Sequence, residues 1–111
     1  MSQCIFCKIA RGESPADVLY RDEQLLVLKD INPQAPVHLL VIPVEHYPNL
    51  QQASANSALV SALIKKCTQL GSELGSQGYR IVVNTGPDGG QTVDHLHFHV
   101  LAGRPLQWPP G

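Results

Sequence analysis

The sequence predicts an α+β fold, in which a five-stranded antiparallel sheet carries one long helix and a short N-terminal helix. Three observations indicate this class. Five short apolar segments are separated by turn-forming residues, one longer stretch has the period of an amphipathic helix, and the connections between them are mostly short. The 111 residues, 43% of them hydrophobic, suit a single domain over residues 1–111 with a modest core.

The short helix or turn is expected over residues 4–9, and a hairpin follows it. Polar residues 21–23 separate two apolar segments, which is typical of a turn between paired strands. Pro33 and Pro36 then require a loop, because proline lacks a backbone donor and pushes its predecessor toward extended geometry. The expected strands cover residues 18–20, 25–28, 38–42, 79–84 and about 92–101.

The long helix is expected between Asn49 and Leu74, where apolar residues recur three and four positions apart. Ser54 or Asn56 could cap its start, since both side chains can accept a bond from a backbone N–H of the first turn. The glycine-containing region 71–78 ends the helix before the fourth strand begins.

Charge and composition argue against several classes of protein. Eight Lys and Arg against nine Asp and Glu give a formal net charge of -1 without a run of like charge, which argues against a nucleic-acid binder. No segment approaches transmembrane length and the N-terminus lacks the pattern of a signal peptide, so we expect a cytoplasmic protein with no membrane partner. Three cysteines, an odd number, argue against a disulfide framework.

Three histidines alternate within the last expected strand. Because successive side chains of a strand point to opposite faces, His95, His97 and His99 share one face, and the apolar residues between them occupy the other. Packing explains the apolar set but not an aligned row of imidazoles. Two functional interpretations follow: an alternating pair could chelate a metal, or the row could hold a nucleophile between supporting imidazoles.

The loop before these histidines favours the second interpretation. Residues 88–92 place two glycines, an amide and a hydroxyl directly before the row, so backbone N–H groups and side-chain donors could surround a phosphate oxygen. A charged flanking imidazole such as His99 could stabilise the charge that develops on those oxygens. The sequence therefore indicates nucleophilic chemistry at phosphorus.

Residues 95–101 resemble the signature of the histidine triad (HIT) superfamily, and residues 30–38, 89–92 and 108–111 resemble its Hint branch, the histidine triad nucleotide-binding proteins. The resemblance implies a HIT-like fold. It also implies hydrolysis of purine nucleoside 5′-phosphoramidates, such as those of AMP and GMP, through a covalent nucleotidyl-histidine intermediate and without a cofactor for catalysis. The alternatives are a dinucleoside polyphosphate hydrolase, or a purine-nucleotide-binding or interaction module with incidental turnover.

The resemblance also assigns roles to individual residues. His97 corresponds to the nucleophile, and its other ring nitrogen would donate to the carbonyl of His95. Asp30 would accept from the ribose hydroxyls, and Thr92 stands where serine is usual but keeps the hydroxyl. The implied catalytic residues are His97, His99, His38 and Thr92. The implied nucleotide-binding residues are Phe6, Ile9, Leu28, Asp30, Ile31, Asn84, Gly90, Gln91, Thr92, His97 and His99.

Cys4 and Cys7 have the separation with which two thiolates bind one zinc ion, and a closed structural site needs four ligands. Resemblance to bacterial relatives with this pair implies that His46 and His95 are the other two, so that His95 would be a scaffold residue for a structural zinc. A thioredoxin-like redox pair is the weaker alternative because no βαβ pattern surrounds the cysteines, and two unligated thiols are the third.

Residues 102–111 form a C-terminal tail that contains Trp108. Such a tail could simply fray, as chain ends often do. The resemblance implies instead a homodimer, in which the two sheets join and each tail packs at the interface and approaches the partner's active site.

Overall fold

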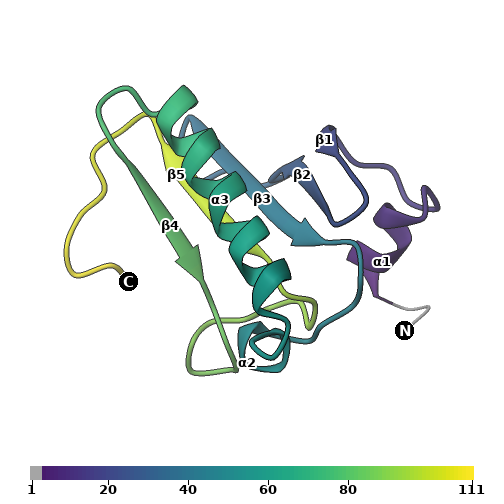
Figure 1. The fold of residues 1–111 in the computed structure, drawn as a ribbon. Helices are drawn as coiled ribbons and strands as arrows, with labels where there is room; N and C mark the ends of the chain where they lie inside the picture. The colour runs from purple at the N-terminus through teal and green to yellow at the C-terminus, as the bar shows by residue number, and fades with distance from the viewer. Residues whose placement is uncertain (1–3) are drawn as a thin grey trace.

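The structure, a computed structural model that describes residues 4–111, contains an antiparallel five-stranded sheet and three helices (Figure 1). The strands are β1 (Val18–Arg21), β2 (Leu25–Lys29), β3 (Val37–Pro43), β4 (Tyr79–Val83) and β5 (Phe98–Ala102). The helices are α1 (Ile5–Ala10), α2 (Leu50–Ala53) and α3 (Ser57–Leu74). Across the sheet the order is β1-β2-β3-β5-β4, which confirms the expected α+β class.

The long helix α3 lies across one face of the sheet (Figure 1). Its Leu63 and Cys67 pack with Val27, Val41 and Val100, which come from the three central strands, and all five side chains are fully buried. Removing this apolar surface from water is what attaches the helix to the sheet.

The opposite face is covered only in part, by α1. Phe6 packs there with the residues of β2 and β3 that point away from α3, namely Leu26, Leu28, Leu40 and Ile42. His38 shares this face because it lies two residues before Leu40, and His99 shares it because it pairs directly with Leu40. On this face the side chains of β2 are thus apolar, whereas β3 and β5 also carry histidines.

The expected single helical stretch is two helices. Asn49 caps α2, accepting from Gln52 N at 2.9 Å, and Asn56 caps α3, accepting from Leu59 N at 3.2 Å. Ser54 instead ends α2, so of the two expected caps Asn56 is the one that starts the long helix. Among residues 4–111, no helix has both the length and the apolar character needed to cross a membrane.

The last strand is shorter than expected, because pairing on both sides begins only at Phe98, opposite Val41 and Val83. Residues 92–97 are irregular, so the prediction of a strand from Thr92 was wrong. Alternation nevertheless continues before β5, since Leu96 joins the same core as Phe98. His95 and His97 therefore lie in the irregular segment just before β5, whereas His99 lies within β5.

Candidate active site

His97 is buried and is oriented by the backbone two residues before it. Its Nδ1 lies 2.8 Å from the carbonyl oxygen of His95. Because a carbonyl only accepts, Nδ1 carries the proton and donates it, and Nε2 presents its lone pair. The ring of Phe6 meets the His97 ring edgewise, with 5.3 Å between the centroids. The proton on Nδ1 gives the tautomer that a nucleophilic imidazole requires. The bond from Nδ1 to the carbonyl of His95 is the one that the family resemblance implies.

His99 is oriented through His38. The backbone N–H of Gln34 donates to His38 Nδ1 at 3.0 Å, so the proton of His38 must lie on Nε2. Nε2 of His38 lies 2.9 Å from Nδ1 of His99 and donates to it, which leaves the proton of His99 on its own Nε2. The His99 ring lies beside His97, with 5.1 Å between the centroids. The chain of contacts therefore ends in an N–H donor next to His97.

His99 is neutral near pH 7, contrary to the charged imidazole that we expected from the sequence. Burial, followed by the neighbouring His97 and His38, lowers the pKa of His99 to about 4, while Asp30 acts in the opposite direction. His99 can still stabilise a phosphate oxygen, but it does so as a neutral N–H donor and not as an imidazolium.

The depressed pKa of His99 predicts that the fold loses stability in acid. Its folded value of about 4 lies below the ordinary 6.5, so between these values the unfolded chain binds a proton that the folded chain does not. The stabilisation is complete above about pH 6.5 and is lost as the pH falls toward 4. Thermal midpoints between these two pH values should fall less in His99→Gln than in the parent protein. An equal fall in both proteins would contradict this account.

The loop before the triad is held together by its own side chains. Gln91 Nε2 donates to Pro48 O at 2.6 Å and to Val93 O at 3.0 Å, while its Oε1 accepts from Gly86 N at 3.0 Å. Asn84 Nδ2 likewise donates within this loop. A phosphate contact through the Gln91 amide would require one of its bonds to be exchanged.

Two backbone donors of this loop are engaged as well. The N–H groups of Gly90 and Gln91 donate to Pro87 O and Gly86 O. Thr92, in contrast, is exposed, with the hydroxyl that we expected at the phosphate. The hydroxyl of Thr92 and the Nε2–H of His99 are donors that a phosphate could engage without breaking these bonds of the loop.

The residues expected around the purine base are only partly brought together. Phe6, Leu28 and the half-buried Ile9 belong to one apolar cluster, which joins α1 to the sheet. Ile31 is 97% exposed and lies outside that cluster, because it follows the end of β2 in the loop that leaves the sheet. Asp30 lies between Leu28 and Ile31 in the sequence. Its Oδ1 accepts from Asn32 N at 2.8 Å, and its Oδ2 lies 3.3 Å from His38 Nε2.

Two cysteines and two histidines converge beneath α1, and their ligand atoms all lie within 4.8 Å of one another. His95 Nδ1 lies 3.3 Å from Cys4 Sγ, 3.6 Å from Cys7 Sγ and 3.1 Å from His46 Nδ1. Ligands in a tetrahedron around zinc, at about 2.1 Å for nitrogen and 2.3 Å for sulfur, are separated by roughly 3.4 to 3.8 Å. The donor set, its number and its spacing therefore fit zinc.

The imidazole of His95 is prepared for such a site. Its Nε2 lies 2.9 Å from the carbonyl of Pro43 and donates to it, so Nδ1 faces the cysteines with its lone pair. Burial lowers the pKa of His95 to about 4, which keeps the ring neutral as a ligand must be. Burial, followed by the neighbouring Cys4, raises the pKa of the Cys7 thiol, so this thiol resists ionising without a cation.

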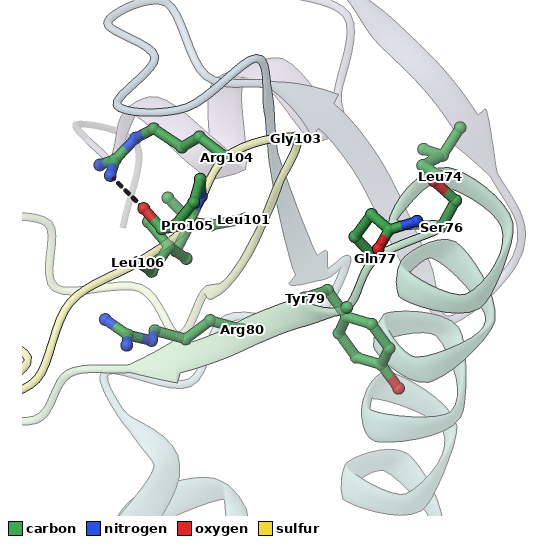
Figure 2. Close-up of a pocket in the computed structure, with 11 residues that line it drawn as sticks. Leu74, Ser76, Gln77, Tyr79, Arg80, Leu101, Gly103, Arg104, Pro105 and Leu106 are labelled. Carbon is green, nitrogen blue, oxygen red and sulfur yellow. Dashed lines mark hydrogen bonds between the residues drawn. The ribbon is translucent and has the colours of Figure 1, made fainter.

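A cavity of about 720 Å³ lies away from the histidines, between the end of α3, the start of β4 and the tail (Figure 2). Arg80 and Arg104 line it, and each uses its guanidinium to hold a backbone carbonyl. Arg104 reaches Gln34, whose N–H orients His38. Nothing in the sequence pattern singled out Arg104 or Gln34, because the two are 70 positions apart.

Comparison with known proteins gives one consistent result. The model of the HIT domain family matches residues 11–106. An uncharacterized HIT-like protein of Synechococcus elongatus is 51% identical over 109 residues, covering 96% of each chain. Among solved structures, a HIT family hydrolase from Legionella pneumophila has a TM-score of 0.93 and 43% identity, covering 98% of this chain and 100% of that one. A HIT family hydrolase from Clostridium thermocellum has a TM-score of 0.89 and 39% identity, covering 96% of both.

Proposed function

The chain belongs to the HIT family, and from that premise we propose that it is a purine nucleoside 5′-phosphoramidate hydrolase of the Hint branch. The observation that carries the proposal is the fixed pair of tautomers at the site. His97 has its Nδ1 proton committed to a carbonyl and its Nε2 lone pair available, and His99 presents an N–H donor beside it. The similarity to HIT family hydrolases supports hydrolysis as the class of reaction.

In the proposed reaction, His97 Nε2 attacks the α-phosphorus and the P–N bond breaks. The amine leaves with a proton taken up from solvent, and the nucleotidyl group remains on His97. The N–H of His99 and the hydroxyl of Thr92 donate to phosphate oxygens as their charge increases. Water then attacks the same phosphorus, which releases the nucleoside monophosphate and restores the lone pair of His97. The carbonyl of His95 stabilises the Nδ1 proton throughout.

The nucleoside would bind beside this centre. The exposed side chain of Ile31 offers an apolar surface that a purine can cover, with the cluster of Phe6, Ile9 and Leu28 behind it. Asp30 Oδ2 would accept from a ribose hydroxyl, since its other oxygen is already engaged by the turn. Asn84 and Gly90 would contribute by shaping the loop on the phosphate side.

A substrate panel separates this proposal from its rivals. We expect adenosine and guanosine 5′-phosphoramidates to be cleaved to the monophosphate and the amine much faster than dinucleoside polyphosphates. The reverse order would favour the dinucleoside polyphosphate hydrolase. Nucleotide binding without turnover of either class would favour the interaction module.

We further propose that Cys4, Cys7, His46 and His95 hold one structural zinc ion. Two thiolates and two neutral imidazoles form a closed tetrahedral set, which leaves no position for substrate. Zinc would join α1 to the segment before the triad and would fix the residue whose carbonyl orients His97. The ion therefore supplies stability and no catalytic step.

We also propose that the protein is a homodimer. Within residues 4–111, β4 is paired on one side only, and unpaired strand edges favour association with a further strand. Trp108 in the tail is 82% exposed, which is unusual for so large an apolar side chain. Light scattering at micromolar concentration should give twice the chain mass, and a monomeric mass would contradict the proposal.

A further inference from the structure

The backbone N–H and the carbonyl of Gln34 both form hydrogen bonds to side chains, and these bonds connect the C-terminal tail to the active site. Its N–H donates to His38 Nδ1 at 3.0 Å. Its carbonyl accepts two bonds from Arg104, from Nε at 3.0 Å and from Nη2 at 2.9 Å. The third bond of the same guanidinium goes to Pro105 O at 3.0 Å, which ties the side chain to its own tail (Figure 2).

The tail is built to approach this loop closely. Gly103 has φ +94, a conformation that residues with a side chain rarely adopt, and a Cβ there would lie 2.8 Å from Cβ of Pro36. This close contact places Arg104 against the loop directly after β5 ends. A charged guanidinium that gives two bonds to one carbonyl holds it in direction as well as in position.

The N–H of Gln34 and the carboxylate of Asp30, whose Oδ2 lies 3.3 Å from His38 Nε2, both favour the proton of His38 on Nε2. While that N–H points at His38 Nδ1, this nitrogen must accept and Nε2 must donate to His99. If the Gln34 backbone rotates away, the other tautomer of His38 becomes available. Its Nε2 would then have no proton to give, and the proton of His99 could move to Nδ1, which would remove the donor beside His97.

We propose that Arg104 is a positioning residue: by clamping Gln34 it fixes the tautomer of His38 and so keeps the N–H donor on Nε2 of His99. The effect on turnover rests on the proposed function, whereas the effect on the tautomers does not. Arg104 does not touch the reacting atoms, since it acts through the Gln34 backbone and His38.

The test compares Arg104→Gln with Arg80→Gln. Both variants remove one positive charge from the same cavity. Arg104→Gln removes the bonds to Gln34 O and Pro105 O, whereas Arg80→Gln removes one bond to Gln107 O and none to Gln34. Long-range proton–nitrogen NMR on protein labelled with 15N-histidine distinguishes the two tautomers of each ring. The parent protein should show His38 and His99 protonated at Nε2.

In Arg104→Gln we expect the His38 and His99 signals to move toward a mixture of tautomers, and kcat for a phosphoramidate to fall about tenfold with KM changed less than about threefold. Arg80→Gln should match the parent in both measurements. Arg104→Lys, which keeps the charge but replaces the planar fork of donors by an ammonium, should lie between, and it decides by the same readouts if Arg104→Gln does not fold.

Tautomers that stay as in the parent protein would overturn the proposal, whatever happens to kcat, because Arg104 would then act by another route. An equal shift in Arg80→Gln would overturn it as well, because the effect would then belong to the cavity and not to the clamp. If the parent turns over no phosphoramidate, the proposed function fails, and the tautomer shift alone decides on Arg104.

Discussion

His97→Ala is expected to lower kcat for phosphoramidate hydrolysis by at least about a thousandfold while leaving the affinity for the nucleoside monophosphate within about threefold. The substitution removes the Nε2 lone pair, and no other ring in the site can replace it. His99 has its proton on Nε2 and His95 faces the cysteines, so neither presents a lone pair toward the substrate. Steady-state kinetics and calorimetric binding of the monophosphate give the two quantities separately.

The control for this change is Gln69→Ala. Gln69 is exposed on α3 and belongs to neither of the two hydrophobic clusters on the faces of the sheet. It should leave both kcat and affinity unchanged. Turnover that survives His97→Ala at the parent rate would refute the assignment of the nucleophile. Loss of nucleotide binding together with turnover would mean that the ring of His97 contributes to binding the ground state as well.

Removal of zinc is expected to lower the stability of the fold about as much as truncating a large buried side chain of the core. The purified protein should contain one zinc ion per chain, and Cys4→Ser with Cys7→Ser should contain none. An ion that binds only the folded chain stabilises it by about 4 kcal/mol at a thousandfold excess over its Kd. For a domain of this size that corresponds to a thermal midpoint lowered by roughly 15 °C after chelation.

Cys67→Ala is the matched control, because this third thiol is fully buried in the core beneath α3 and not in the cluster. That variant should keep its zinc and should respond to a chelator as the parent does, even if it is less stable. A parent protein without stoichiometric zinc, or with a midpoint indifferent to chelation, would contradict the site. Two unligated thiols would then be the better description of Cys4 and Cys7.

The sequence predicted the fold because the hydrophobic pattern and the turn residues agree with each other along the chain. The apolar residues of β2 and β3 point to both faces, and most of them are buried. The error at residues 92–97 has a physical origin. Alternation of side chains marks which face each residue occupies, but it does not show whether a neighbouring strand is present to pair with.

The site could be predicted only where its residues carry the chemistry themselves. The row of histidines and the pair of cysteines could be recognised as candidate site residues from their residue types and their spacing. The charge of His99 depends on burial and on two neighbouring rings, neither of which is visible in a sequence. The clamp from Arg104 to Gln34 uses a backbone carbonyl, which every residue possesses, and so left no signal in the pattern.

Trapping the covalent intermediate tests whether His97 is the nucleophile that bonds to the nucleotidyl group. The protein is mixed with a large excess of a purine nucleoside phosphoramidate, quenched within the first turnover, digested and weighed by mass spectrometry. The account predicts that one nucleotidyl group appears on the peptide that contains His97, is located on that histidine by fragmentation, and is absent from His97→Ala. Full turnover of the same substrate with the label on another residue, or with none at any quench time, would contradict it.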